Sequence, residues 1–282
     1  MVISSLRWRA ASALIAAGAA AAGVLALAVP AGASTGPRYA SVEQVGYAAT
    51  GAQFSQVRAW VYLRNPAQYA SVAGQYSQSV QLWSSGLVAV FGASASTSGS
   101  AGYTPYADIF DVGSHHLLAS DPNPEWCDNA GNCGTTVGTF PVGDRVRFTL
   151  TYYPKTGDLY FETDDTRRHF TADYTAAAGV SFTQARVGTE FGSDPWTAPA
   201  SFTHPAAWTK IAVYNRVRLQ TYNGKFSTLA SWFVHHKVLM AGISGSLIDV
   251  EAAPTDLSSG GASFQEWLAP AGVSGPVQPP RG

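Results

Sequence analysis

The most constraining feature of this sequence is a hairpin signal in its middle, over residues 145–165. Two runs rich in β-branched and aromatic residues, RVRFTLTYY and LYFETDD, flank the short segment PKTGD, which holds a proline and a glycine. Such runs favour extended strands, and a short Pro/Gly turn between them favours antiparallel pairing. The chain is therefore expected to build an antiparallel β-sheet around this segment.

Short strand signals recur along the rest of the chain, while helical periodicity is scarce. Residues 55–63 alternate, with Val57, Ala59 and Val61 on one face and polar or aromatic side chains on the other. This pattern predicts an all-β fold, a two-sheet antiparallel β-sandwich of the jelly-roll kind. Further strands are expected at residues 79–84, 87–94, 106–112, 185–191, 209–222 and 245–253, and residues 226–241 fit either a pair of strands or a short helix.

The N-terminus carries the pattern of a secretory signal peptide. Arg7 and Arg9 precede an apolar run over residues 10–29, and residues 31–33 are small, as a signal peptidase requires. We expect cleavage after Ala33 and a secreted, extracellular protein, although a run of this length could also stay as a membrane anchor. The expected organisation is a signal peptide over residues 1–33, one β-sandwich domain over residues 38–269 and a Pro/Gly-rich disordered tail over residues 270–282.

The charge composition limits the partners that this chain can have. Charged residues make up only 12% of the chain, and loss of Arg7 and Arg9 with the signal peptide leaves acidic residues in slight excess. Without a basic stripe, a nucleic-acid partner is not expected. We expect a monomer with a polypeptide or polysaccharide ligand, with no cofactor and no membrane contact after signal cleavage.

Cys127 and Cys133 lie close together in the segment WCDNAGNC. In an exported protein, cysteines at this spacing favour a disulfide that closes a small turn-rich loop. A calcium site using nearby carboxylate and amide oxygens is a weaker alternative. The pairs His115-His116 and His235-His236 do not predict a zinc site, because adjacent residues of a strand face opposite ways. No metal is therefore expected.

One pair of carboxylates lies in the second strand of the hairpin. Glu162 and Asp164 are two residues apart, so both project from the same face of a strand. Paired acids on one face can act as nucleophile and general acid in a glycoside hydrolase. The signature of laminarinase-type sandwiches, Glu-x-Asp-x-x-Glu, is broken here by Arg167. A solvated outer face that ends at a turn explains this pair more simply.

Glu190 differs from this pair because its strand is otherwise poor in acidic residues. It lies in ARVGTEFGSD, with Phe191 beside it and Trp196 close by. A carboxylate that is partly buried among apolar groups has a raised pKa and can serve as a general acid or base. Glu190 is therefore a candidate catalytic residue, with an ordinary charge at a strand end as the alternative.

The order of these segments resembles that of the glutamic peptidases, or eqolisins. VGYAATGAQFSQVRAWVYLRNP is similar to the first strands of that family, FPVGDRVRFTLTYYPKTGDLYFETDDTRRHF is similar to its central hairpin, and ARVGTEF falls where the family has an Ala-Glu-aromatic-x-x-Glu segment. The resemblance covers most of residues 46–225. It implies a concanavalin-like β-sandwich and endopeptidase activity at acid pH, and it places the catalytic glutamate of the family on Glu190.

The resemblance also implies a glutamine partner for Glu190. In the family, the glutamate activates a water as general base and the glutamine amide stabilises the oxyanion. The matching position here is Val90, which cannot donate a hydrogen bond, and the first glutamate of the Ala-Glu segment becomes Arg186. Gln81, on the preceding strand, and Gln184 are the amides that could replace the missing partner.

Several aromatic residues suggest a binding surface instead of, or beside, a catalytic site. Trp60, Trp83, Tyr62 and Tyr106 lie on expected strands and could form a stacking platform for sugars, although packing in the core would explain them equally well. Trp83, Trp60 and Tyr106 are the candidate substrate-binding residues. The alternative function is thus a non-catalytic module that binds a carbohydrate or a peptide.

Overall fold

The computed structural model describes the chain between residues 43 and 270, with gaps. The described residues are 43–65, 75–96, 102–111, 117–120, 126–127, 133–134, 139–164, 169–175, 178–192, 206–232, 234–238 and 252–270. The expected signal peptide, the tail beyond residue 270 and His115-His116 lie outside these residues. Within the described part, no helix is long and apolar enough to cross a membrane.

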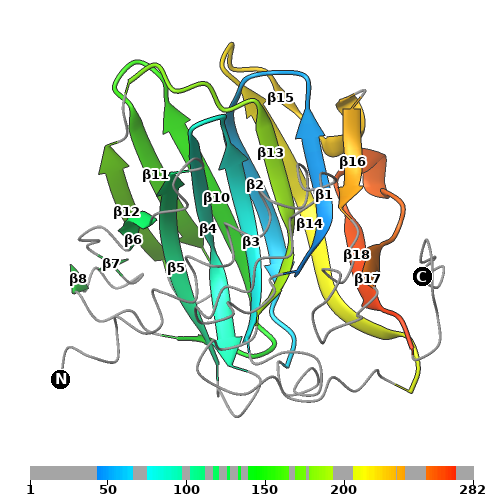
Figure 1. The fold of residues 1–282 in the computed structure, drawn as a ribbon. Helices are drawn as coiled ribbons and strands as arrows, with labels where there is room; N and C mark the ends of the chain where they lie inside the picture. The colour runs from blue at the N-terminus through cyan, green and yellow to red at the C-terminus, as the bar shows by residue number, and fades with distance from the viewer. Residues whose placement is uncertain are drawn as a thin grey trace, which may run out of the picture.

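In the described part of the chain, two antiparallel sheets of eight strands each make up the sandwich, as the strand pattern predicted (Figure 1). The first sheet has the order β16-β1-β13-β3-β4-β5-β6, with β9 beside β5. Its strands are β1 (Glu43–Thr50), β3 (Gln75–Trp83), β4 (Leu87–Ser96), β5 (Gly102–Asp111), β6 (Leu117–Ser120), β9 (Phe140–Pro141), β13 (Gln184–Gly192) and β16 (Val234–Val238).

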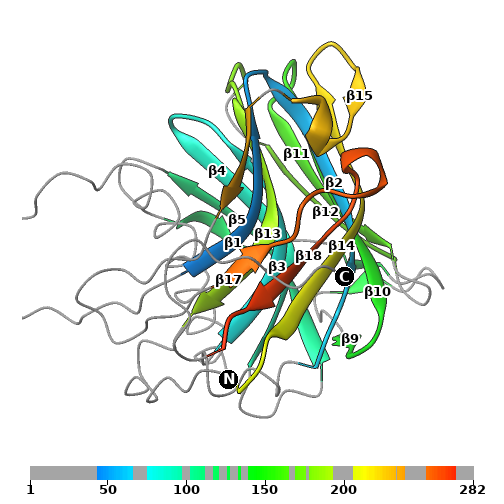
Figure 2. The ribbon, with the colours of Figure 1, turned by 90° about the vertical axis from the view of Figure 1, so that its right-hand side faces the viewer.

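The second sheet has the order β12-β11-β10-β2-β14-β18-β17, with β15 beside β14. Seen from the side, the two sheets form separate layers, with β1, β4 and β5 in one and β10 and β14 in the other (Figure 2). The strands of the second sheet are β2 (Phe54–Tyr62), β10 (Arg145–Tyr153), β11 (Asp158–Asp164), β12 (His169–Thr175), β14 (Thr209–Thr221), β15 (Phe226–Ser227), β17 (Ala252–Pro254) and β18 (Phe264–Leu268).

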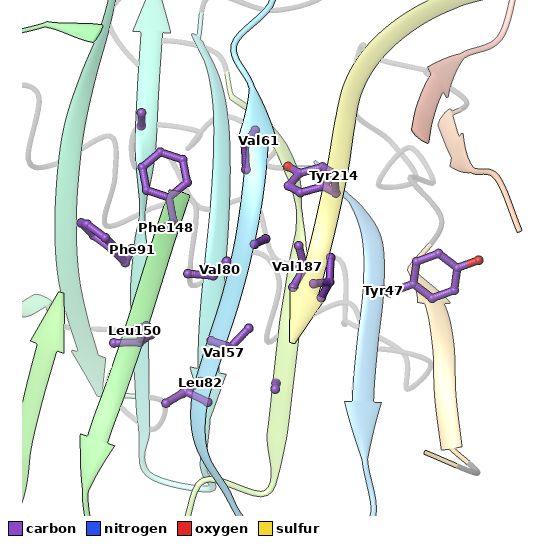
Figure 3. Close-up of a cluster of buried hydrophobic side chains, with 14 of the residues drawn as sticks. Tyr47, Val57, Val61, Val80, Leu82, Phe91, Phe148, Leu150, Val187 and Tyr214 are labelled. Carbon is purple, nitrogen blue, oxygen red and sulfur yellow. The ribbon is translucent and has the colours of Figure 1, made fainter. Parts of the chain in front are cut away.

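A hydrophobic core fills the space between the sheets. Alternation along each strand turns one set of side chains inward, and Figure 3 shows Val57 and Phe148 of the second sheet close to Val80 and Phe91 of the first. The rings of Phe91 and Phe148 meet edge to face, with centroids 5.4 Å apart. Each such buried side chain contributes about 1.5–3 kcal/mol to stability, so the core holds the two sheets together.

The predicted central hairpin is confirmed. Strands β10 and β11 pair from Arg147 opposite Asp164 to Tyr153 opposite Asp158. The turn closes through a hydrogen bond from the Gly157 amide to the Tyr153 carbonyl, 2.8 Å long, and Gly157 has a φ of 84°. A glycine fits this left-handed position because it lacks the Cβ that makes such a backbone costly for other residues.

The ambiguous segment at residues 226–241 crosses from one sheet to the other. It contains β15, a short 3₁₀ helix (Leu229–Ser231) and β16. These two strands do not pair with each other, because β15 joins β14 in the second sheet whereas β16 joins β1 in the first. The described residues of this segment therefore form two short strands in different sheets, with one turn of 3₁₀ helix between them.

The two cysteines lie in a small hairpin of their own, formed by β7 (Trp126–Cys127) and β8 (Cys133–Gly134). The backbone register puts Cys127 directly opposite Cys133. Residues opposite each other in an antiparallel pair have Cβ atoms about 4.5–5.5 Å apart. The disulfide remains a prediction, because the side chains of these residues are not among those described.

Candidate active site

Four neighbouring strands of the first sheet bring the candidate residues onto one face. In the register of β13, β3, β4 and β5, Arg186 is opposite Gln81, Gln81 is opposite Val90, and Val90 is opposite Asp108. Because side chains alternate, Gln81 projects away from the core whereas its neighbours Val80 and Leu82 project into it. The outward face of the first sheet is therefore the site face.

Glu190 and Gln81 are in direct contact on this face. The Gln81 Nε2 donates a hydrogen bond to the Glu190 Oε1, and both residues are 0% exposed. Glu190 is opposite Ser77 and Gln81 is opposite Arg186, and the pair Gly188 and Ser79 lies between these two positions on the same face. These small residues leave room for two long side chains to lean toward each other.

Gly188 has a second reason to be a glycine. A Cβ at this position would lie 2.1 Å from the carbonyl oxygen of Val45 on the neighbouring strand β1. Such a contact is far below the van der Waals limit, so any larger residue would push β1 away from β13. The close approach of these strands therefore fixes a small residue beside the Glu190–Gln81 pair, called the dyad below.

Trp83 fixes the orientation of the Gln81 amide. The Trp83 Nε1 donates a 2.7 Å hydrogen bond to the Gln81 Oε1, and the Gln81 Nε2 also donates to the Ser79 Oγ at 3.0 Å. An indole N–H can only donate, so the carbonyl end of Gln81 must face Trp83. The amide NH₂ is then left to face Glu190.

Arg186 packs against the ring of Trp83. Its guanidinium carbon lies 4.0 Å from the centroid of the Trp83 ring, in a cation–π arrangement, and its Nε donates to the Gln184 Oε1 at 2.7 Å. Burial lowers the pKa of Arg186 to about 10, and the nearby Glu190 acts in the opposite direction. Gln184, the second amide that sequence reasoning proposed, thus binds Arg186.

The environment of Glu190 favours its neutral form. Burial is the largest cause and raises its pKa from the ordinary value of 4.5 to about 7. The charge of Asp108 raises the pKa further, whereas hydrogen bonds from Gln81 and Ser77 and the charge of Arg186 lower it. A carboxyl that changes its protonation state near neutrality can serve as a general acid or base.

Tyr106 and Asp108 complete the site face on β5. Asp108 is buried and Tyr106 is half-buried, and burial of the Tyr106 hydroxyl together with the charge of Glu190 raises its pKa well above the ordinary range. The sequence indicated Tyr106 but not Asp108. The alternation of β5 puts Asp108 on the same face as Tyr106, and an acid at that position of an apolar strand was the signal that could have identified it.

The structure corrects the strand from which the amide comes. The resemblance pointed to the position of Val90 on β4, but Val90 lies beside Gln81, and the amide that reaches Glu190 belongs to the neighbouring strand β3. Val90 therefore leaves no gap in the dyad. Its aliphatic side chain is 2% exposed and lies between Gln81 and Asp108 in the register.

The remaining candidates lie on the other sheet. Trp60 and Tyr62 are on β2 and project outward from the second sheet, so they do not share a platform with Trp83 and Tyr106. Glu162 is on β11, forms an ion pair with Arg147 at 2.5 Å, and its side chain is 41% exposed. Asp164 lies two residues along the same strand. This acidic pair is thus remote from Glu190.

Metal ligands are not gathered in the described part of the chain. No group of three or more His, Cys, Asp or Glu residues there is arranged to hold a metal ion. The backbone of β16 places His235 and His236 opposite Ala49 and Ala48 of β1.

Comparison with known proteins gives likeness in structure but not in sequence. No family model and no curated protein matches the chain. One similar structure is scytalido-glutamic peptidase with a peptide-based transition-state analogue, which is 13% identical to this chain with a TM-score of 0.47. Another is SCP-B, described as a member of the eqolisin family, in complex with the tripeptide Ala-Ile-His; it is 13% identical to this chain with a TM-score of 0.49. Both alignments cover 82% of this chain and 100% of the other.

Proposed function

We propose that this protein hydrolyses peptide bonds, with Glu190 as the general base and Gln81 as the oxyanion donor. The observation that carries the proposal is the contact between a buried carboxyl and an amide whose NH₂ is aimed at it by Trp83. A base and a fixed donor at adjacent positions are the two groups that hydrolysis of an amide through an oxyanion requires.

In the proposed reaction, a water and the scissile carbonyl enter between Glu190 and Gln81. Glu190 takes a proton from the water while the oxygen of that water bonds to the carbonyl carbon. The Gln81 amide donates a hydrogen bond to the oxyanion that forms. The C–N bond then breaks, and the proton passes from Glu190 to the leaving amine. The direct hydrogen bond between Gln81 and Glu190 is replaced by contacts to substrate during this cycle.

The burial of the dyad sets the pH range of this reaction. General base catalysis needs the ionised carboxylate, and in the buried site that form dominates only above a pH of about 7. The resemblance implies activity at acid pH, which would require the pKa of Glu190 to fall back toward 4.5. Opening of the site to water would lower the pKa in this way, because burial is the largest cause of its shift.

The test is hydrolysis of a denatured protein substrate between pH 2 and 9 by the wild-type protein and Glu190→Gln. We expect wild-type cleavage and a loss of about 10²–10⁴-fold in the variant, the usual contribution of a positioned base. A rise in rate through pH 7 indicates reaction in a buried site, and activity at pH 3 indicates an opened one. Glu162→Gln, which changes a surface acid, is the matched control and should retain activity. Absence of cleavage at every pH would overturn the proposal.

A second candidate function is a non-catalytic binding module for a peptide or carbohydrate. The observation in its favour is that Glu190 and Gln81 are both 0% exposed, so the pair could be a satisfied structural contact. Saturable binding of an oligosaccharide or peptide without turnover, unaffected by Glu190→Gln, would favour this reading over the peptidase.

Export belongs to the same proposal. Residues 7–33 have the charge and hydrophobicity of a cleavable signal, and a secreted hydrolase would act on extracellular protein. N-terminal sequencing of the protein recovered from the culture medium should begin at Ser34. Recovery of the uncleaved chain in the membrane fraction would instead indicate a retained anchor.

A further inference from the structure

A cluster of arginines lies on the outward face of the second sheet, on the opposite side of the sandwich from Glu190. Strand β10 contributes two of them next to aromatic residues of β2, with Arg145 opposite Tyr62 and Arg147 opposite Trp60. Strand β14 places Arg218 opposite Arg58 of β2. We call this surface the arginine face; its members are Arg58, Arg145, Arg147, Arg216 and Arg218.

Like charges are adjacent on the arginine face. Arg58 and Arg218 are directly opposed across β2 and β14, an arrangement that destabilises a sheet. The pKa of Arg58 is lowered first by burial and then by the charges of Arg147 and Arg218, while Glu162 acts in the opposite direction. An anionic ligand would relieve this repulsion.

A β-bulge in β14 adds to the exposed charge. Two residues of β14, Arg216 and Val217, stand against the single residue Ala59 of β2. The extra residue lets Val217 enter the core while Arg216 and Arg218 are both exposed. Arg216 has a φ of 51°, a left-handed conformation that is costly for a residue with a side chain. An arginine at a position that suits glycine points to a role for its charge.

Among the described side chains, Glu162 of β11 pairs with Arg147 of β10. The backbone register also places Asp164 of β11 opposite Arg147. Arg58 and Arg218 lie on β2 and β14, on the far side of β10 from β11. The centre of the arginine face is therefore positive, although the whole chain has a formal net charge of −1.

Aromatic side chains accompany the arginines. The guanidinium carbons of Arg145 and Arg147 lie 5.0 Å and 5.9 Å from the centroid of the Trp60 ring. Such cation–π contacts help to hold the two guanidinium groups in place. Tyr62 and Tyr160 are exposed on the same outward side of the sheet.

We propose that the arginine face binds an acidic polysaccharide, a chain of uronate sugars. The planar fork of arginine matches a carboxylate, and an exposed tyrosine can stack against a sugar ring. A pleated sheet surface spaces such groups regularly along an extended chain. The whole protein has a slightly negative net charge, which disfavours general attraction to nucleic acid. The positive charge of the arginine face is local, which suits an anionic ligand that can also stack on the aromatic rings there.

The test compares polygalacturonate with the same polymer in methyl-esterified form, which has the same sugars without the charge. Isothermal titration should show binding of the acid form, at least about tenfold weaker binding of the ester, and a similar loss in Arg58→Gln/Arg218→Gln, because hydrogen bonds to charged groups are the strong ones. Lys225→Gln, which removes an exposed cation elsewhere, is the matched control and should bind normally.

Three outcomes would overturn this proposal: no binding of polygalacturonate, equal binding by the double arginine variant, or equal binding of single-stranded DNA, which would indicate a surface for any polyanion. Glu190→Gln should bind polygalacturonate as tightly as the wild-type protein. Failure of the peptidase proposal would therefore leave this result unchanged, and the two can be judged separately.

Discussion

The two outward faces of the sandwich each carry a tryptophan beneath an arginine, but the two pairs have different surroundings. On the first sheet, Trp83 is buried and its N–H points into the dyad, with Arg186 4.0 Å from its ring centre. On the second sheet, Trp60 is half-buried and Arg145 lies 5.0 Å from its ring centre. A tryptophan with an arginine over its ring is thus part of a buried hydrogen-bond network on the first sheet and part of a solvated charged surface on the second.

Burial accounts for the difference. Removing a charged group from water disfavours its charged form, so Glu190 acquires a pKa of about 7 and depends on its neighbours for hydrogen bonds. On the solvated face, water screens the arginines, and each contact there is worth little by itself. Substitutions on the site face should therefore have large effects, and equivalent substitutions on the arginine face small ones.

The largest contrast is expected for glutamine substitutions. Gln81→Leu should lower kcat by about 10²–10³-fold, as the loss of one oxyanion donor does, with little change in KM. Gln56→Leu on the second sheet removes a hydrogen bond of 2.9 Å to the Thr151 Oγ1 and should leave kcat unchanged. Steady-state kinetics on a peptide substrate measures both, and an unaltered kcat in Gln81→Leu would remove the amide from the mechanism.

The pH dependence of stability should also separate the two faces. The folded-state pKa of Glu190 is raised from 4.5 to about 7, so the folded protein holds this proton more tightly than the unfolded chain. Its contribution is fully present below pH 4.5 and is lost as the pH rises to 7. Between pH 4 and 8, the wild-type protein should lose about 3 kcal/mol of unfolding free energy that Glu190→Gln retains.

Denaturant unfolding of both proteins at several pH values measures this difference. Glu266 is also fully buried and its pKa is raised well above the ordinary value, which gives the same sign. Its contribution is present in both proteins and cancels when they are compared. A pH-independent difference for Glu190→Gln would contradict the raised pKa.

A smaller contrast is expected for the tryptophans. Trp83→Phe leaves the Gln81 Oε1 buried without its donor and should cost about 1–3 kcal/mol of stability. It should also lower kcat more than it changes KM, because the freed amide can rotate away from Glu190. Trp60→Phe should be close to neutral in both measurements. Equal effects in the two variants would show that Trp83 does not orient the amide.

The smallest effect should come from the arginine face. Arg58→Gln removes a like-charge contact with Arg218 and should raise the unfolding free energy by about 0.2–1 kcal/mol at low salt. The gain should vanish in high salt, because screening already weakens the repulsion. Thermal unfolding at two salt concentrations checks this, and a clear loss of stability would mean that Arg58 is held by favourable contacts.

Strand alternation was enough to predict most of the fold. The hairpin at residues 145–165 and the alternation around Val57 and Val61 depend on local pattern, and the structure confirms both. Which sheet receives a strand depends on pairing between distant segments, which periodicity does not encode. For that reason Trp60 and Trp83, which are alike in the sequence, were placed on one platform but lie on opposite faces.

The site was only partly predictable for the same reason. Glu190 stood out as an acid in an apolar strand, and Gln81 was a candidate among amides. That Gln81, not a residue at the position of Val90, reaches Glu190 depends on how far two side chains lean across Gly188 and Ser79. Asp108 was missed although it is an acid in a mainly apolar strand, because its place beside Val90 on the site face follows only from the pairing of β5 with β4.

The most direct measurement is the ionisation of Glu190 itself. Carbon-13 NMR of the side-chain carboxyls, with Glu190→Gln to assign the signal, follows its titration in the intact protein. A midpoint near pH 7 is expected, because burial holds the proton against the stabilising contacts of Gln81 and Arg186. A midpoint near the ordinary value of 4.5 would show that Glu190 is not held in a buried dyad and would contradict the proposed site.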